Sequence, residues 1–239
     1  MPSDGSPLSA DELRSLRDAH RDRGLHREDL GADPIVQFAQ WYEEWRASGA
    51  YNPEAMVVAT ARSDGRPSAR TVLLRGIDER GFVFYTNYES RKGAELAENP
   101  QAAICFPWIT IDRQIRVVGR VEHTGAHESD AYWATRHRGN QLAGSVSDQS
   151  RPVADRATLQ RRFDELDARF AGEEVPRPSH WGGYRVVPEE FEFWQSGPDR
   201  RHDCFRYRRP EVAALSAPDD AAHAPAANER GWIIERLMP

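Results

Sequence analysis

The feature that most constrains the fold is a series of short β-rich runs between Ala55 and Glu122. Gly, Asp and Pro residues separate the runs, as is typical of tight turns. A single helical pattern, from Ser90 to Glu98, interrupts the series. The runs read AMVVATA, SARTVLL, FVFYT, QAAICFPW and QIRVVGRV. Short sequential strands joined by tight turns predict an antiparallel barrel.

Helical and strand patterns also flank this series. The helical patterns cover Ser9 to about Arg23, a stretch that opens at Asp33-Pro34, His127 to Trp133, and Arg156 to Phe170. The strand patterns cover Tyr184 to Val187, Glu190 to Trp194, Phe205 to Tyr207, and Trp232 to Leu237. We therefore expect a mainly β fold with flanking helices. We expect one domain over residues 33–239, preceded by a helical extension at 1–32, with an Ala/Pro/Asp-rich mobile loop at 210–230.

Cations are concentrated between Arg70 and Lys92. The apolar runs at 72–74 and 82–85 predict a β-hairpin whose polar turn spans Gly76 to Gly81, with Arg70 and Arg75 at the ends of the first strand. Ser90 can cap the next helix, which places Arg91 and Lys92 in its first turn. Cations are unfavourable there unless an anion is near. The segment indicates a phosphate cradle, with a solvated basic helix start as the alternative.

Two further segments combine aromatic, basic and amide side chains. In the first, an aromatic strand ending at Trp194 runs into a turn that holds Arg200 and His202. An indole, a guanidinium and an imidazole together suit a planar anionic ligand. In the second, Tyr132 and Arg136 are four residues apart and would share one face of a helix. The alternatives are an exposed, salt-bridged hairpin and a capped surface helix.

Composition limits the class of ligand. The formal net charge is −6, so the cations above are a local feature of an acidic chain, which suits a small anion better than nucleic acid or a membrane surface. The two cysteines, Cys105 and Cys204, show no metal-binding spacing. His123 and His127 have Gly125 between them and no completing ligands, so we expect no metal site. Without an apolar leader or span, the chain is expected to be soluble and cytoplasmic.

Taken together, the segments resemble the pyridoxine/pyridoxamine 5′-phosphate oxidase family from about Asp33 to the C-terminus. The resemblance is carried by AMVVAT, RTVLLR, GFVFYTNYESRKG, FPW, RQIRVVG, QSRPV, PSHWGGYRV, EFWQSG and RRHD, in this order. It implies an FMN-binding split β-barrel and a homodimer with two FMN sites at the subunit interface.

The resemblance also assigns residues to ligands. It implies FMN contacts at Arg70, Thr71, Val72, Leu73, Leu74, Arg75, Tyr85, Thr86, Arg91, Lys92, Gln114, Gln149, Ser150 and Trp194. It implies substrate contacts at Arg75, Tyr132, Arg136, Asn140, Arg200 and His202, the last two beside the reacting carbon. Arg91 and Lys92 would meet the FMN phosphate. A weaker match at Arg17 to His20 suggests a lid.

Three single positions and one three-residue run depart from the family pattern. Arg75 stands where Lys is usual, and Asn140 where Ser is usual. Cys204 replaces an Arg that commonly contacts FMN, which should weaken flavin binding unless Arg201 or Arg206 substitutes. The run 143–145, Ala-Gly-Ser, replaces Gly-Ala-Trp and would open space for a different substrate.

The activity implied by the resemblance is oxidation of pyridoxine or pyridoxamine 5′-phosphate to pyridoxal 5′-phosphate, with O2 reduced to hydrogen peroxide. The substrate-side departures keep open a repurposed FMN oxidase of phenazine-type secondary metabolism. The missing cation at Cys204 keeps open a third reading, a flavin- or pyridoxal phosphate-binding protein without catalysis.

Overall fold

The computed structural model describes residues 8–210 and 226–239. Within these residues, nine antiparallel strands form one sheet in the order β2-β1-β5-β6-β7-β4-β3, with β8 on β7 and β9 on β8. The strands are β1 (Ala55–Ala61), β2 (Pro67–Leu73), β3 (Gly76–Asp78), β4 (Gly81–Asn87), β5 (Gln101–Trp108), β6 (Arg113–His123), β7 (Trp181–Gln195), β8 (Asp203–Arg208) and β9 (Ile233–Leu237). The predicted mainly β class and antiparallel pairing are confirmed.

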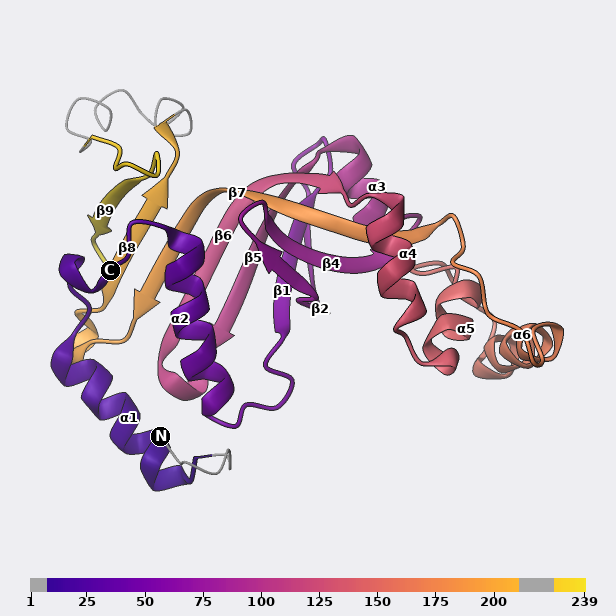
Figure 1. Ribbon diagram of the computed structural model, residues 1–239, viewed down its shortest axis with the longest axis horizontal. Helices are drawn as coiled ribbons and strands as arrows, with labels where there is room; N and C mark the ends of the chain where they lie inside the picture. Colours follow the sequence, from indigo (N-terminus) through magenta and orange to yellow (C-terminus); the bar gives the residue numbers. More distant parts are fainter. Residues whose placement is uncertain (1–7, 211–225) are drawn as a thin grey trace.

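Six α-helices accompany the sheet in the described residues. They are α1 (Ala10–Arg23), α2 (Pro34–Ala47), α3 (Arg91–Glu98), α4 (Ala126–Ala134), α5 (Arg138–Val146) and α6 (Arg156–Arg169). Ser9, Asp33 and Ser90 cap α1, α2 and α3 through their side-chain oxygens, as their positions in the sequence indicate. Figure 1 shows α1, β8 and β9 at one end of the molecule and α3 to α6 at the other.

The predicted hairpin between the runs at 72–74 and 82–85 is wrong. Strand β2 pairs with β1 instead, and the segment predicted as a polar turn supplies β3, which pairs with β4. The pairing starts at Arg75, whose backbone N–H donates to the carbonyl of Val83 at 2.8 Å. Strand β3 pairs with β4 only at Gly81, Phe82 and Val83, and β7 pairs along the opposite edge of β4.

The two strands predicted at 184–187 and 190–194 form one long strand, β7. Its first half pairs with β4 and its second half with β8, while β6 runs beside both. The register shifts between Val118 and Gly119 of β6, opposite Pro188. A Cβ at Gly119 would lie 2.0 Å from the Val187 carbonyl oxygen, so this close approach of the two backbones requires glycine.

An aromatic core joins α2 to the barrel, and α2 crosses the face of the sheet in Figure 1. Phe38 is fully buried, with its ring centroid 4.9 Å from that of Phe82 and 4.8 Å from that of Phe106. Trp108 packs against the same cluster. This packing makes the barrel a rigid support for its outer strands.

The expected mobile loop at 210–230 falls mostly on residues 211–225, which lie outside the described residues. Helix α5 was not anticipated, because its short sequence carries Gly, Asn and Ser and has no clear apolar period. No helix among the described residues is long and apolar enough to cross a membrane.

Candidate active site

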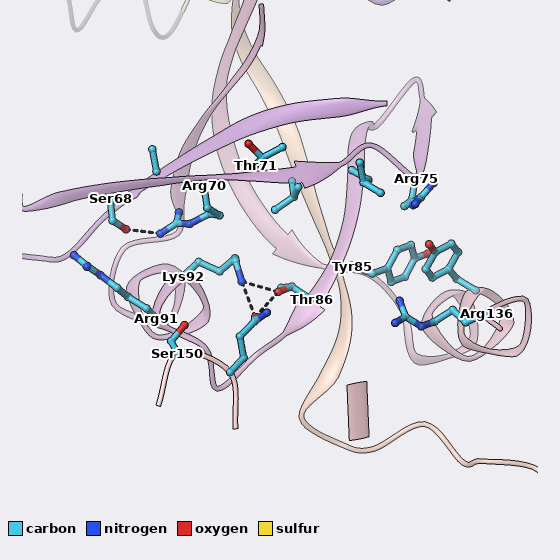
Figure 2. A pocket seen from close by; sticks show the side chains of 15 residues that line it. Ser68, Arg70, Thr71, Arg75, Tyr85, Thr86, Arg91, Lys92, Arg136 and Ser150 are labelled. Atoms are coloured by element: carbon cyan, nitrogen blue, oxygen red, sulfur yellow. Dashed lines mark hydrogen bonds between the residues drawn. The ribbon is translucent and has the colours of Figure 1, made fainter. Parts of the chain in front are cut away.

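A cavity of about 530 Å³ opens between β2, β4, the start of α3, the end of α4 and the segments that follow α4 and α5, a volume usual for a small-molecule site. Its walls come from sequence segments as far apart as residues 68 and 150. The lining residues are Ser68, Ala69, Arg70, Thr71, Val72, Leu73, Arg75, Tyr85, Thr86, Arg91, Lys92, Tyr132, Arg136, Gln149 and Ser150. In Figure 2 the labelled cations form two groups: Arg70, Arg91 and Lys92 at one end, and Arg75 and Arg136 at the other.

Lys92 is the centre of the first group. Its ammonium group donates to Thr86 Oγ1 at 2.8 Å, to Gln149 Oε1 at 2.8 Å and to Ser90 Oγ at 3.2 Å. Burial lowers the pKa of Lys92 to about 8, and the positive charge of Arg70 adds to this effect. It is the only lysine in a sequence with 32 lysines and arginines. A compact ammonium fits three acceptors around one nitrogen, which a planar guanidinium does not.

A buried carboxylate, Glu95, connects the other two cations of this end. Arg91 Nε donates to Glu95 Oε1 at 2.9 Å, and Arg70 Nη2 lies 3.3 Å from Glu95 Oε2. Hydroxyl groups of Thr60 and Ser68 also donate to this carboxylate, each at 2.5 Å. Burial opposes its ionisation, but the surrounding donors outweigh burial and lower its pKa to about 2. The three cations and one carboxylate leave two net positive charges.

The opposite end of the cavity is aromatic and basic. The rings of Tyr85 and Tyr132 stack with centroids 4.0 Å apart, and Trp181 stacks on Tyr85 at 5.5 Å. The Arg136 guanidinium lies over the Trp181 ring, 4.6 Å from its centroid. Burial raises the pKa of Tyr85 to about 12, so its hydroxyl stays neutral at physiological pH. This end can hold a planar ring together with an anionic group.

Tyr132 and Arg136 both line the cavity, but they do not share a helix face as their spacing predicts. Helix α4 ends at Ala134, so Arg136 lies in the link to α5 rather than on the helix face of Tyr132. Its Nη2 donates to the Asn140 carbonyl at 2.9 Å. The Asn140 side chain is exposed and is not part of the cavity wall. The Asn140 backbone therefore orients Arg136 in this structure.

The structure brings thirteen of the predicted ligand contacts into this one cavity. They are Arg70, Thr71, Val72, Leu73, Arg75, Tyr85, Thr86, Arg91, Lys92, Tyr132, Arg136, Gln149 and Ser150. Leu74 is buried in the hydrophobic core instead.

A second group of predicted contacts lies elsewhere in the chain. Gln114 and Trp194 are paired across β6 and β7. The cavity residue Tyr85 pairs with Gly183, which lies eleven residues before Trp194 on β7. An extended strand rises about 3.3 Å per residue, so roughly 35 Å of strand separates the two positions. Arg200 and His202 follow β7 directly and belong to this second group.

The turn after β7 is held in an uncommon conformation. Asp199 and Arg200 both have positive φ values, 52° and 60°. The His202 ring lies 4.7 Å from the Trp194 ring, and its Nδ1 accepts a hydrogen bond from the Gly197 N–H at 3.2 Å. Strained backbone of this kind often marks a functional turn. Within the part of the chain that the structure describes, His202 Nε2 has no hydrogen-bond partner. It is therefore available to a ligand.

Helix α1 docks beside this second group. The Gln195 side chain donates to the His20 carbonyl at 2.9 Å, and Arg21 lies 2.5 Å from Asp112. His20 is buried, with its Nε2 3.4 Å from a Glu44 oxygen. The segment proposed as a lid is therefore fixed next to Trp194 and His202, and a lid function stays a prediction.

Cys204, which stands where the family commonly has an Arg, is a buried and neutral residue. Burial raises the pKa of Cys204 to about 12, so the thiol is protonated and a poor nucleophile. Of the two suggested substitutes for the missing cation, Arg206 is engaged by Glu235 at 2.9 Å, while Arg201 is exposed and pairs with Asp199.

The space left by the missing Trp is not part of the active-site cavity. Ser145 borders a separate cavity of about 310 Å³ that Arg162, Leu166 and Arg169 of α6 also line. Its hydroxyl donates back to the Gln141 carbonyl at 2.9 Å. In the described residues Ser145 therefore lines this second cavity and not the one of about 530 Å³, and room for a different substrate stays a prediction.

Sequence reasoning missed Glu95 and Ser68, which complete the cationic end. The available signal was the spacing of Arg91 and Glu95, four residues apart on a predicted helix. No group of three or more His, Cys, Asp or Glu side chains that could hold a metal ion occurs in residues 8–210 and 226–239.

Comparison with known proteins decides the family. Residues 43–170 match the family described as pyridoxamine 5′-phosphate oxidase, and residues 181–239 match the pyridoxine 5′-phosphate oxidase C-terminal dimerisation region. The chain belongs to the pyridoxamine 5′-phosphate oxidase family. Its match to a dimerisation region supports a homodimer. A family member named pyridoxine/pyridoxamine 5′-phosphate oxidase, from Rubrobacter xylanophilus, is 53% identical over 198 residues, which cover 83% of this chain and 91% of that protein.

Solved structures confirm the fold. PhzG from Burkholderia lata 383, solved with tetrahydrophenazine-1-carboxylic acid, is 32% identical with a TM-score of 0.77, covering 90% of this chain and 98% of its own. A pyridoxamine 5′-phosphate oxidase-related, FMN-binding protein from Nostoc punctiforme is 16% identical with a TM-score of 0.62, covering 88% and 100%. The predicted split-barrel architecture of this family is thereby confirmed. An oxidoreductase is supported by the family match and by the relatives named as oxidases.

Proposed function

We propose that this protein is an FMN-dependent oxidase that converts pyridoxine or pyridoxamine 5′-phosphate to pyridoxal 5′-phosphate and reduces O2 to hydrogen peroxide. The observation that carries the proposal is the cavity with cations at both ends. A phosphorylated flavin and a phosphorylated substrate that share one site need two separate phosphate positions, and the two cation groups supply them. We also propose the cytoplasm as its location.

The cavity residues fit FMN. The two net positive charges around Lys92, Arg70, Arg91 and Glu95 match a phosphate that carries nearly two negative charges at neutral pH. The α3 N-terminus adds free backbone N–H groups beside them. The apolar part of the wall, Val72 and Leu73, offers a surface for the flavin ring.

Bound FMN would supply the redox chemistry, since it accepts a hydride and passes electrons to O2. The protein's part is binding and orientation. Arg75 and Arg136 would hold the substrate phosphate, while Tyr85 and Tyr132 flank the pyridine ring. This clamp fixes the reacting carbon relative to the flavin, which lowers the entropic part of the barrier.

We further propose that each active site uses both subunits of a homodimer. Gln114, Trp194, Arg200 and His202 lie far along β7 from the cavity of their own chain. In this arrangement they would complete the cavity of the second copy. The expected dimer has two equivalent sites, each with its cationic cavity from one chain and its Trp194–His202 turn from the other.

A mixed-dimer experiment tests this arrangement. Lys92→Met and His202→Ala variants are each expected to be impaired, and a heterodimer of the two should contain one intact site and one doubly defective site. We expect co-expressed, separately tagged heterodimers to regain about half of the wild-type activity per dimer, since C2 symmetry gives two independent sites. Heterodimers as inactive as both parents would show that each site is built within one chain.

The phenazine-type alternative has one specific observation in its favour, the structural similarity to PhzG. A substrate panel discriminates the two. We expect pyridoxamine 5′-phosphate to give pyridoxal 5′-phosphate and hydrogen peroxide in equal amounts, with pyridoxamine much poorer because it leaves Arg75 and Arg136 unpaired. Turnover of a reduced phenazine carboxylic acid without turnover of any phosphorylated vitamer would favour the alternative.

The pH dependence of FMN binding follows from Lys92. Its pKa of about 8 in the flavin-free protein means that above pH 8 Lys92 is mostly a neutral amine, which must take up a proton when the phosphate binds. FMN affinity is therefore expected to be constant from pH 7 to 7.5 and to fall above pH 8 by up to about tenfold per pH unit. Titrations of flavin-stripped protein from pH 7 to 10 measure this. Affinity that rises with pH would contradict the role of Lys92.

A further inference from the structure

We propose that Glu95 is a positioning residue that makes the cavity selective for a phosphorylated flavin over the same flavin without phosphate. Glu95 would not touch the flavin itself. It would act through Arg91 and Arg70, the two cations that its carboxylate holds. This inference rests on the proposed FMN site and goes beyond it, because it assigns flavin selectivity to an acidic residue.

The burial of Glu95 is the first observation. Its exposed fraction is 2%, although it lies on α3 only four residues after the exposed Arg91. An ionised carboxylate is costly to bury unless donors surround it. Four side chains donate to it, and they come from β1, β2 and α3. The site is thus built around a fixed negative charge.

The dependence of Arg91 on this carboxylate is the second observation. Among the described residues, Glu95 is the only hydrogen-bond partner of Arg91, whose side chain is 61% exposed. A long exposed side chain loses considerable conformational entropy when it is held in place. Because Glu95 already holds the Arg91 side chain in the folded protein, this entropy is lost during folding and not during binding. Arg91 is therefore oriented before an anion binds.

Arg70 shows the same principle on the strand side. Its guanidinium donates to the Val58 carbonyl at 3.1 Å, to Thr60 Oγ1 at 2.6 Å and to the Ser68 hydroxyl, and it pairs with Glu95. Glu95 also counters the repulsion between Arg70 and the nearby Lys92 ammonium. The Glu95 carboxylate therefore reduces the charge repulsion among Arg70, Arg91 and Lys92, which allows the three cations to lie close together.

The selectivity follows from where these contacts lie. Glu95 contacts Arg70 and Arg91, which lie with Lys92 at one end of the cavity, whereas Tyr85 and Arg136 lie at the other end (Figure 2). A flavin without phosphate makes no ionic contact with Arg70, Arg91 and Lys92. Loss of Glu95 should therefore weaken FMN and spare riboflavin, whereas a general packing defect would weaken both flavins equally.

The test is to titrate flavin-stripped, full-length protein with FMN and with riboflavin and to follow flavin fluorescence. Glu95→Ala removes all four acceptor contacts, and Glu95→Gln keeps one acceptor oxygen. Glu98→Ala is the matched control, because Glu98 lies on the same helix and is exposed, and within residues 8–210 and 226–239 its side chain accepts hydrogen bonds only from Ser63, in the turn after β1. Circular dichroism and thermal melting follow the fold of each variant.

We expect Glu95→Ala to raise the Kd for FMN at least tenfold and to leave the Kd for riboflavin within about twofold. Glu95→Gln should fall between Glu95→Ala and wild type, and Glu98→Ala should match wild type. An unchanged Kd for FMN in Glu95→Ala, or an equal loss for both flavins, would overturn the inference while leaving the FMN site in place. Wild-type protein that binds neither flavin would overturn the proposed function itself.

Discussion

Replacing Lys92 with Met is expected to weaken FMN binding by about 3 kcal/mol, roughly 100-fold in Kd, because it removes a buried charge that faces a phosphate. The methionine side chain fills a similar volume, so the change is mainly electrostatic. Thr86 and Gln149 also lose the donor they now share. The measurement is a fluorescence titration of flavin-stripped protein with FMN.

Lys92→Arg is the informative companion variant. It keeps the positive charge but replaces a compact ammonium by a planar fork, and the three oxygens around Nζ are arranged for a single nitrogen. We expect FMN affinity between those of wild type and Lys92→Met. Equal FMN affinity in wild type and Lys92→Met would show that the first cation group does not hold the phosphate.

Arg136→Met is expected to act on the substrate and not on the flavin. Removal of a guanidinium that pairs with a phosphate should cost about 2 kcal/mol, roughly 30-fold in KM for pyridoxamine 5′-phosphate. Methionine retains an apolar contact with Trp181, which limits the structural effect. Steady-state kinetics give KM, and the FMN titration should give a Kd within about twofold of wild type.

The comparison of Arg136→Met with Lys92→Met separates the two ends of the cavity. If the account is correct, each variant impairs one ligand and spares the other. A large loss of FMN affinity in Arg136→Met, with an unchanged KM, would mean that the flavin phosphate occupies the Arg75–Arg136 end.

The sequence predicted much of this site because its local signals agree with the fold. Alternating apolar residues define β1, β5 and β6, and Ser90 begins α3 where its side chain can cap it. These signals depend on neighbouring residues only. The motif resemblance then brought Tyr132, Gln149 and the strand residues together, which no local pattern could do.

The errors have a common cause, since each concerns a contact between segments. Strand β3 is three residues long, too short for a pattern, and it pairs with β4, whereas the expected partner β2 pairs with β1. The halves of β7 read as two strands because Pro188 interrupts the apolar alternation, while the backbone continues past a register shift opposite Val118 and Gly119 that leaves Glu189 of β7 without a partner on β6. Glu95 looked like an ordinary surface acid, because burial of a charge is visible only after β1 and β2 are folded over α3.

The measurement that tests the central claim most directly is anaerobic mixing of the FMN-loaded protein with pyridoxamine 5′-phosphate, followed by the visible absorbance of the flavin. The account predicts that the flavin is bleached, that one pyridoxal 5′-phosphate forms per flavin, and that admission of O2 restores the absorbance with release of hydrogen peroxide. Flavin that stays oxidised with both pyridoxamine and pyridoxine 5′-phosphate would contradict the account.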